Sequence, residues 1–383
     1  MKQPQDVVMK QPRILVVGAG IAGLALVRAL RDQGLGAEVV ERDPDWRTTG
    51  AGLYLPANAV RALERLGLGT ELARRAHPVT RQRMLDHRGR ALADFPVRAI
   101  WGGVGDCLAI SRAGLHDLLR SAVGDSVVRL GTGVTSVDDA GTVTFADGSS
   151  ETYDVVVGAD GAGSAVRRSA FGGAEPRFLG QICWRFLAHE DPAAPPVTDW
   201  TVRLGSGGRT FLTVPLGEGR LYCYADVNSA EPVAPAGDWR ALFADFAGPV
   251  PYLLEQGVDA YFAPLSEIDD SDWARPHAVL VGDAAHACSP SMAQGGAMAL
   301  EDVLVLAELL GGAARAGAAA RTDIGAVLAA YQARRADRVR WVLGQNQRRD
   351  KARNLPTPLR NLTLRIAGER LFKANHAPLH AEA

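Results

Sequence analysis

The chain has 383 residues, 47% hydrophobic and 22% charged, which is typical of a globular protein large enough for two domains. Its formal net charge of −1 lacks the excess of basic residues with which proteins bind nucleic acids or anionic membranes, so we expect neither partner. The four cysteines are scattered without a C-x-x-C pair, which argues against disulfides, a metal site and an iron–sulfur cluster.

The N-terminal residues carry no signal-peptide pattern. Residues 1–12 are polar and contain the sequence Met-Lys-Gln-Pro twice, so we expect a loose, disordered tail. The apolar run over 14–27 is too short to span a membrane and is interrupted by glycines. These features predict a cytoplasmic protein.

A nucleotide-binding unit is predicted directly after the tail. Apolar residues 14–17 form a strand that leads into a Gly-rich turn from Gly18 to Gly23, and a helix continues to Gln33. A second strand over 37–40 ends at Glu41, which follows Gly23 by 18 residues, close to the spacing of a ribose-binding acid. Because Glu41 would repel a 2′-phosphate, the pattern predicts an adenosine diphosphate group, as in FAD or NAD.

The following segment combines predicted helices with short strands. We predict helices over 58–66 and 111–121, a β-hairpin of strands 82–86 and 90–95, and strands at 127–130, 133–137, 143–145 and 153–157. Ser111 is a suitable N-cap for the second helix. The last strand runs into the sequence Gly158-Ala159-Asp160-Gly161.

From Arg177 to Trp273 the sequence changes character. Alternating strands that contain aromatic residues are predicted near 182–187, 200–204, 210–215 and 221–226, and a helical stretch over 239–246 follows. This pattern indicates an antiparallel sheet with helices, inserted between nucleotide-binding segments. Three aromatic residues of these strands are candidates for lining a substrate cavity, with core packing as the alternative: Phe211, Tyr222 and Tyr224. Of these, Tyr222 and Tyr224 share one face because side chains alternate along a strand.

Residues 281–302 are the most informative segment of the chain. An apolar strand over 278–281 ends at Gly282 and Asp283, which places a carboxylate where ligands of open α/β sheets bind. A turn around Pro290 and the pair Gly295-Gly296 precede a helix over 297–310, whose N-terminus offers free N–H groups and positive potential to an anion. A carboxylate and a helix end suit the ribityl chain and the ring of a reduced flavin.

The C-terminal part is predicted to be helical after a loop. Residues 311–320 are rich in alanine and glycine and are expected to form that loop, and a long Arg-rich helix follows over 324–349. Four arginines of this helix are predicted to form a solvated face: Arg334, Arg335, Arg338 and Arg340.

The Gly18–Gly23 turn with Glu41, the pair Asp160-Gly161 and the pair Gly282-Asp283 together closely resemble the group A flavoprotein monooxygenases. These are single-component aromatic hydroxylases with the p-hydroxybenzoate hydroxylase fold. The resemblance covers about 14–349. It implies an α/β fold: a Rossmann-like, three-layer (ββα) FAD-binding domain at 13–75, 104–176 and 276–322, an inserted antiparallel-sheet substrate domain at 76–103 and 177–275, and a C-terminal helical region at 323–383.

The resemblance assigns cofactor roles to single residues. The Gly18–Gly23 turn would hold the FAD pyrophosphate, Glu41 the ribose, and Asp283 the ribityl hydroxyls. The segment 50–58 would lie beside the flavin. The complete set of implied cofactor-binding residues is Gly18, Gly20, Ala22, Gly23, Glu41, Arg42, Arg112, Asp160, Gly282, Asp283, Gly295, Gly296 and Ala297. The chain departs from the family pattern at Ala293, where glycine is common, and at Ala297, where asparagine or cysteine often stands.

Several residues near the implied ring have open roles. Arg185 would orient an anionic or carbonyl-bearing substrate or position the flavin; the alternative is a surface arginine stacked on Trp184 or Trp200. Pro290 would shape the space beside the ring. His286 belongs to the flavin motif and is expected to be structural, and Cys288 to be a small buried residue. We assign no general base and no metal ligand.

The resemblance implies a reaction in which NADPH or NADH reduces FAD. Dioxygen then adds at the flavin 4a carbon, and one oxygen atom passes to a small aromatic or electron-rich substrate, which is hydroxylated or epoxidised in a natural-product or catabolic step. The protein would be a monomer or a homodimer. Two alternatives remain: a flavoprotein reductase of isoprenoid-type double bonds, and a non-catalytic FAD-loaded binding protein. A flavin-dependent halogenase is disfavoured because no W-x-W-x-I-P sequence is present.

Overall fold

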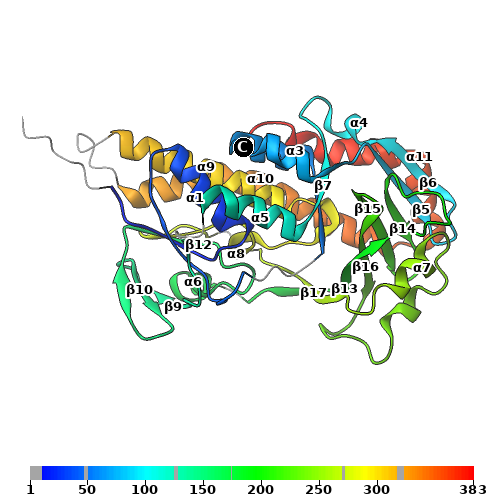
Figure 1. The fold of residues 1–383 in the computed structure, drawn as a ribbon, viewed down its shortest axis with the longest axis horizontal. Coiled ribbons are helices and arrows are strands. Elements are labelled where there is room, and N and C mark those ends of the chain that lie inside the picture. Colours follow the sequence, from blue (N-terminus) through cyan, green and yellow to red (C-terminus); the bar gives the residue numbers. More distant parts are fainter. Residues whose placement is uncertain (1–10, 47–50, 125–127, 174, 270–271, 317–322) are drawn as a thin grey trace, which may run out of the picture.

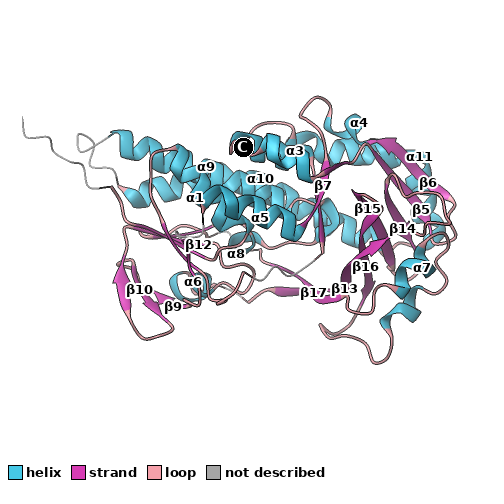
Figure 2. Cartoon of the chain, in the orientation of Figure 1, coloured by secondary structure: helices cyan, strands magenta, loops and turns pink. Residues whose placement is uncertain are grey.

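The computed structural model describes residues 11–46, 51–124, 128–173, 175–269, 272–316 and 323–383. The molecule is elongated, with long helices and small sheets toward one end and a large twisted sheet toward the other (Figures 1 and 2). Some parts of the predicted features lie outside the described residues. They are the tail before Gln11, Gly50, Val127 and the end of the loop expected over 311–320.

Five parallel strands form the centre of the nucleotide-binding part, in the order β18-β12-β1-β2-β8. Their bounds are β1 Ile14–Val17, β2 Glu38–Val40, β8 Val128–Arg129, β12 Val155–Gly158 and β18 Ala278–Leu280. Strands β1, β12 and β18 are buried along their whole length, as expected for parallel strands that are covered on both faces. The predicted strand–helix–strand opening is therefore confirmed.

Alternate residues of β1 show what covers each face of this sheet. Ile14 and Val16 pack in a cluster with three helices, whereas Leu15 and Val17 pack in a second cluster with residues of a small antiparallel sheet. The helices are α1 Ile21–Asp32, α5 Arg112–Val123 and α9 Gly295–Ala316; the other layer is formed by β9 Val134–Val137, β10 Thr142–Phe145, β11 Ser150–Thr152 and α6 Ala165–Ala170. The predicted three-layer ββα fold class is confirmed.

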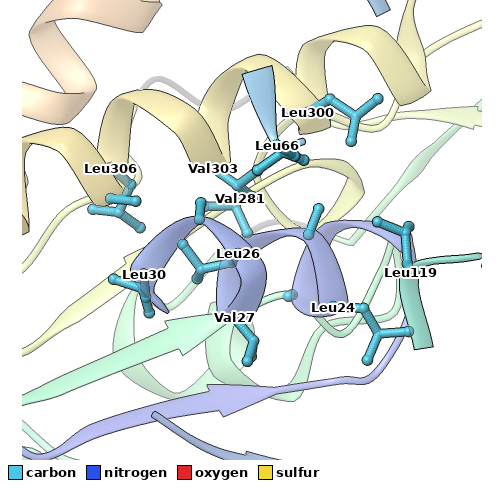
Figure 3. Packing of buried hydrophobic residues seen from close by; sticks show 14 of the residues in the cluster. Leu24, Leu26, Val27, Leu30, Leu66, Leu119, Val281, Leu300, Val303 and Leu306 are labelled. Atoms are coloured by element: carbon cyan, nitrogen blue, oxygen red, sulfur yellow. The ribbon is translucent and has the colours of Figure 1, made fainter. Parts of the chain in front are cut away.

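Helices α1 and α9 pack directly against each other above the parallel sheet (Figure 3). Leu26 and Leu30 of α1 and Val303 and Leu306 of α9 belong to the same fully buried cluster, which Val281 joins from the end of β18. Full burial of one such side chain stabilises the fold by roughly 1.5–3 kcal/mol. This contact fixes α9, and hence its N-terminus, relative to the first strand–helix turn.

A second sheet has seven strands, in the order β17-β13-β16-β15-β14-β5-β6. Their bounds are β5 Arg81–Asp86, β6 Ala91–Pro96, β13 Arg177–His189, β14 Trp200–Leu204, β15 Thr210–Gly217, β16 Arg220–Asn228 and β17 Tyr261–Glu267. The predicted hairpin forms β5 and β6. The inserted strands β13 to β17 pair antiparallel with one another, as predicted, whereas β5 pairs with β14 in parallel and so joins the hairpin to the inserted strands.

Shorter elements link the two sheets. Strands β3 Gly52–Leu55, β7 Leu108–Ser111 and β4 His77–Pro78 form a three-stranded antiparallel sheet, so part of the segment implied to be a flavin-adjacent loop is a strand. The remaining helices before α8 are α2 Ala57–Arg65, α3 Gly69–Arg75, α4 Val97–Trp101, the 3₁₀ helix η2 Trp239–Phe243 and α7 Val250–Glu255. Ser111 caps α5 as predicted, since its hydroxyl accepts a hydrogen bond of 3.0 Å from the Gly114 N–H.

The chain ends in two long helices and a short one. They are α10 Ile324–Arg353, α11 Thr357–His376 and the 3₁₀ helix η4 Ala377–Leu379; α11 packs on β6 at the far end of the large sheet (Figure 1). The prediction of a loop over 311–320 is wrong in part, because α9 continues to Ala316. Alanine favours the helix, and glycine at position 311 lets the helix pack against Gln33, to which a Cβ would come within 2.6 Å. In the described part of the chain no helix is apolar and long enough to cross a membrane.

The expectation of a solvated arginine face on α10 is wrong for Arg335. Its side chain is fully buried, whereas that of Arg340 is 69% exposed. Arg335 donates hydrogen bonds to Asp302 (Nε–Oδ1, 2.8 Å) and to Glu301 (Nη2–Oε2, 3.0 Å). Arg338 also contacts Glu301, at 2.8 Å. The helix therefore turns two of its arginines toward acidic residues of α9.

Asp302 is the centre of this buried network. One oxygen of its carboxylate accepts from Arg335, and the other accepts from the Gly282 N–H at 2.9 Å and bonds His286 Nε2 at 2.7 Å. Burial acts to raise the pKa of Asp302, but the charges of His286 and Arg335 and the hydrogen bonds outweigh it and lower the pKa. The carboxylate thus ties the end of β18 and helix α10 to α9.

We predict that Asp302→Asn lowers the free energy of unfolding by about 3–5 kcal/mol, because it removes one of the two carboxylates that compensate the buried Arg335 guanidinium and leaves only Glu301. Urea denaturation of the protein measures this change. Asp337→Asn is the matched control on α10, because Asp337 is 91% exposed and pairs only with the exposed Arg340; its effect should stay within about 0.5 kcal/mol. Equal effects of the two substitutions would contradict the role given to Asp302.

Candidate functional site

A cavity with a volume of about 430 Å³ lies between the nucleotide-binding part and the seven-stranded sheet. Its wall combines Ile21 of α1, Asp283 and the N-terminus of α9 with residues from strands of the seven-stranded sheet and from α10 and α11. Segments from the whole length of the chain therefore meet here. The predicted cofactor and substrate residues can be placed relative to this cavity.

Each glycine of the Gly18–Gly23 turn is needed for a different geometric reason. Gly18 has φ +103°, and a Cβ there would approach the Ala159 carbonyl oxygen to 2.6 Å. A Cβ at Gly23 would lie 1.9 Å from the Gly18 carbonyl oxygen, so α1 can pack on the turn only without one. A Cβ at Gly20 would meet no atom within 4 Å. Gly20 thus presents bare backbone to open space, which is what a close-lying pyrophosphate requires.

Glu41 lies just after β2, beside this turn. Its carboxylate accepts the Ala19 N–H at 2.9 Å and the Asp43 N–H at 3.0 Å, and it therefore faces the start of α1. Arg42 is exposed. Arg112 starts α5, and its side chain lines the cavity next to Ile21 and Leu115.

Asp160 has a structural task that the sequence did not indicate. One carboxylate oxygen accepts from the Ser164 hydroxyl at 2.5 Å, and the other accepts from the Ala165 N–H at 2.7 Å. Both oxygens are thus engaged at the start of α6. A contact of Asp160 with FAD or a nicotinamide stays a prediction.

The segment after β18 carries the flavin motif. Gly282 has φ +59° and leads into the one-turn helix α8 Asp283–His286, so that Asp283 faces the cavity. The first free N–H groups of α9 belong to Gly295, Gly296 and Ala297, because the helical hydrogen bonds start with Met298 N–H to the Gln294 carbonyl, 2.8 Å. These three residues line the same part of the cavity as Asp283. A carboxylate and a helix N-terminus therefore face one space.

His286 is structural in this arrangement, in line with its expected role, because it is buried and bonds Asp302 rather than facing the cavity. Cys288 lines the cavity and is half-buried, and burial raises the pKa of its thiol, with the charge of Asp283 adding to the shift. A thiol held protonated in this way is a poor nucleophile.

The sheet register decides which predicted substrate residues face the cavity. Arg185 of β13, Tyr224 of β16 and Leu212 of β15 are cross-strand neighbours, and all three line the cavity, as does Tyr222 two residues before Tyr224. The prediction for Phe211 is wrong: it pairs with Ala225 on the opposite face and packs fully buried in the core with Phe186 and Phe243. Side chains alternate between the two faces of a strand, which explains why Tyr222 and Tyr224 face the cavity and Phe211 does not.

The structure also distinguishes the two roles considered for Arg185, a residue of the cavity wall and a surface arginine stacked on Trp184. Trp184 points to the opposite face of the sheet and stacks on Trp239, with ring centroids 4.8 Å apart, so Arg185 does not stack on it. The Arg185 guanidinium lies 5.8 Å from the centroid of the Tyr224 ring, and its Nε is buried without a hydrogen-bond partner. Arg185 therefore belongs to the cavity wall.

Sequence reasoning missed several residues of this wall. Trp200 of β14 and Tyr54 of β3 lie with ring centroids 4.2 Å apart, and Gln82 of β5 pairs in register with Trp200. Tyr224 donates to Asp226 at 2.9 Å, and Arg353 of α10 forms an ion pair with the same carboxylate at 2.8 Å. Their positions depend on strand pairs far apart in the chain.

A clamp from α10 holds the turn that carries Pro290, which forms the 3₁₀ helix η3 Pro290–Met292. The Met292 N–H donates to Asn346 at 2.8 Å, and Arg349 Nη1 donates to the Ser291 carbonyl at 2.7 Å. Asp350 accepts from the hydroxyls of Ser291 and Ser289, at 2.5 and 3.1 Å. Because these three side chains are spaced i, i+3, i+4, they share one face of the helix. Pro290 itself lines the cavity.

These features fit a bound FAD molecule. Gly20 provides bare backbone for the pyrophosphate, Glu41 a carboxylate beside it, Asp283 an acceptor for ribityl hydroxyls, and the start of α9 free N–H groups for the ring.

Comparison with known proteins decides the family. The family model of the FAD binding domain matches residues 11–177 and 269–346. The chain belongs to this family. It is 34% identical over 342 residues to aurachin C monooxygenase/isomerase of Stigmatella aurantiaca and 32% identical over 342 residues to the FAD-dependent urate hydroxylase of Mycolicibacterium vanbaalenii. In each case the match covers 85% of both chains.

A solved structure supports the same family assignment. The structure is similar to that of Klebsiella pneumoniae HpxO in complex with FAD and uric acid, with a TM-score of 0.82, 28% identity, and coverage of 98% of this chain and 97% of the other. The predicted enzyme class, an FAD-dependent monooxygenase, is confirmed, and so is FAD as the cofactor.

We predict that Gly23→Ala destabilises the FAD-free protein and that Gly20→Ala does not. The new Cβ at position 23 must displace the Gly18 carbonyl, whereas the one at position 20 enters open space. The free energy of unfolding, from urea denaturation of FAD-free protein, should fall by more than about 2 kcal/mol for Gly23→Ala and change by less than about 1 kcal/mol for Gly20→Ala. A reversed order would show that the turn is described wrongly.

Proposed function

We propose that the protein uses NADPH or NADH and dioxygen to insert one oxygen atom into a small aromatic or heteroaromatic substrate bound in the cavity. The observation that carries the proposal is that Asp283 and the α9 N-terminus line the same cavity as Arg185, Tyr222 and Tyr224. A flavin held at the first set of residues would have its ring next to a substrate held by the second set.

When bound, FAD supplies the electron transfer and dioxygen activation that amino-acid side chains do not provide. The chain's own contribution at the ring is electrostatic. The N–H groups of Gly295, Gly296 and Ala297 and the positive end of the 22-residue helix α9 would hold the flavin ring and stabilise negative charge on it when it is reduced. A helix N-terminus contributes about 0.3–2 kcal/mol to such a charge.

The cavity wall would exclude water from the reacting atoms. Most of the wall beyond Asp283 is apolar or aromatic, with Leu212, Val214, Trp200 and Phe372 among its residues. Pro290 would border the same space, and the α10 clamp keeps its turn in place. A dry, preformed space favours oxygen transfer to the substrate over loss to water.

Aromatic side chains support an aromatic substrate. Tyr54 and Trp200 lie together at one side of the cavity, and Tyr222 and Tyr224 lie at another, so a flat ring can stack or pack edge-on against them. The similar proteins named above act on urate and on aurachin C, as their names state. We extend to this chain only the shared feature, a substrate with an electron-rich ring.

The test is a substrate screen with the purified, FAD-loaded protein. NADPH and NADH oxidation is followed with and without each of a panel of phenols, hydroxypyridines, quinolones and purines, and products are examined by mass spectrometry. The proposal predicts stimulated, oxygen-dependent oxidation and a product that has gained one oxygen atom. Anaerobic reduction of an isoprenoid double bond would favour the reductase alternative, and the absence of stimulation throughout the panel would favour the binding protein.

Glu41→Ala tests the proposed ribose contact. Loss of a hydrogen-bonding carboxylate should weaken FAD binding about 10- to 100-fold. FAD affinity is measured by fluorescence titration of the FAD-free protein. Glu38→Ala is the control on the same strand, because Glu38 pairs with Arg13 on the surface, 3.1 Å away, and should leave FAD affinity unchanged. Unchanged affinity in Glu41→Ala would reject the ribose contact.

A further inference from the structure

Gln294 directly precedes the free N–H groups at the start of α9. Its carbonyl accepts the Met298 N–H at 2.8 Å, so the position of Gln294 determines where the helix begins. The side chain of Gln294 is fully buried and is not part of the cavity wall, although Ala293 and Gly295 on either side of it are. Gln294 can therefore act on a ligand in the cavity only through the backbone that it holds.

Asn58, in the first turn of α2, forms a reciprocal amide pair with Gln294. Asn58 Nδ2 donates to Gln294 Oε1 at 2.9 Å, and Gln294 Nε2 donates to Asn58 Oδ1 at 3.3 Å. Asn58 is also buried and lies outside the cavity wall. Helix α2 follows strand β3, which lines the cavity. The pair therefore joins the start of α9 to a segment beside the same cavity, although the two residues are 236 positions apart in the chain.

The carboxylate of Glu301 fixes the direction of this pair. Asn58 Nδ2 also donates to Glu301 Oε1, at 2.9 Å. A carboxylate only accepts hydrogen bonds, so the NH2 group of Asn58 faces Glu301 and its oxygen is left for Gln294. Glu301 is itself held by Arg335 and Arg338, at 3.0 and 2.8 Å. The two amides thus have a single arrangement, which buried charges determine.

The backbone directly before Gln294 is strained. Ala293 has φ +52°, in the left-handed region that residues with a Cβ rarely adopt. Such a conformation persists only where the surroundings hold it. On one side the Ala293 N–H donates to the Pro290 carbonyl at 2.8 Å, in the turn that α10 clamps. On the other side the amide pair holds Gln294. Ala293 is therefore fixed from both sides.

We propose that Asn58 is a positioning residue for the flavin. Through its pair with Gln294 it keeps Ala293 in the strained conformation and directs the free N–H groups of α9 into the cavity. Reduction places negative charge on a flavin ring, and a helix N-terminus stabilises such a charge. In this role Asn58 raises the affinity for reduced FAD relative to oxidised FAD and so raises the reduction potential. The inference rests on the proposed function, since that places the ring at the start of α9.

The midpoint potential of the FAD-loaded protein tests the proposal without a substrate. It is measured during anaerobic reduction in the presence of a reference dye of known potential. Asn58→Leu removes the amide at similar size and displaces the helix start. Its binding of reduced FAD should therefore weaken about tenfold more than its binding of oxidised FAD. For a two-electron couple, a tenfold change corresponds to a potential lower by about 30 mV.

Gln294→Met gives an answer even if Asn58→Leu fails to fold. It removes the other half of the pair and should lower the potential by a similar amount. The double variant should lower the potential no further than either single variant, because both substitutions remove the same interaction.

Ala293→Gly tests the link to the strained backbone. Glycine adopts a positive φ without steric cost, so the helix start should depend less on the amide pair in this protein. Within it, Asn58→Leu should change the relative affinity for reduced FAD by only about threefold.

Arg61→Gln is the control for general destabilisation of α2. Arg61 lies three residues after Asn58 and donates hydrogen bonds of 2.8 Å to the carbonyls of His380 and Ala381. Its loss removes contacts of the same helix without touching Gln294, so the potential should stay unchanged.

The proposal is overturned if Asn58→Leu and Gln294→Met keep the parent potential, or if Arg61→Gln lowers the potential as much as they do. An equal effect of Asn58→Leu in the parent and in the Ala293→Gly protein also overturns it. These outcomes are distinct from failure of the proposed function. If the potential falls as predicted but no aromatic compound is oxygenated, the proposed function fails and the role of Asn58 stands. If aromatic compounds gain oxygen and the potential does not change, the proposed function stands and the role of Asn58 fails.

Discussion

The site depends on one buried carboxylate. Asp302 of α9 accepts hydrogen bonds from Gly282 and from Arg335 of α10 and bonds His286 of α8, so a single charged group connects the segment 282–286, α9 and α10. Gly282, which has a positive φ, donates its N–H to this carboxylate and precedes Asp283, which faces the cavity. A buried charge is tolerated here only because Arg335 and His286 compensate it.

The same helix that carries Arg335 shapes the far side of the cavity. Further along α10, Asn346, Arg349 and Asp350 hold the Pro290 turn, and Arg353 pairs with Asp226 of the large sheet. A single rigid helix therefore sets the position of the flavin motif at one point and of the substrate wall at another. This construction explains how a site with residues from every part of the chain is held without a metal-binding cluster in the described residues.

Local patterns were sufficient to predict the cofactor end of the site. The Gly18–Gly23 turn, the cap at Ser111 and the strand that ends at Asp283 each depend on residues close in sequence. The substrate end depends on partners far apart. There, the pairing of Arg353 requires Asp226, 127 residues earlier. At the flavin motif, the burial of Arg335 also requires distant partners, two acids 33 and 34 residues earlier. The prediction for Phe211 was wrong because side chains alternate between the two faces of a strand, and only the pairing with Ala225 shows which face Phe211 occupies.

We infer that the Asp302 network holds the flavin-binding segment in place before FAD binds. The most direct measurement is an experimental structure of the FAD complex. We predict that the backbone from Gly282 to Met298 lies within about 1 Å of its present position. We also predict that Asp302 still accepts from Gly282 N–H, and that the flavin ring lies between the α9 N-terminus and the row of Arg185 and Tyr224. A rearranged segment, or FAD bound outside this cavity, would contradict the account.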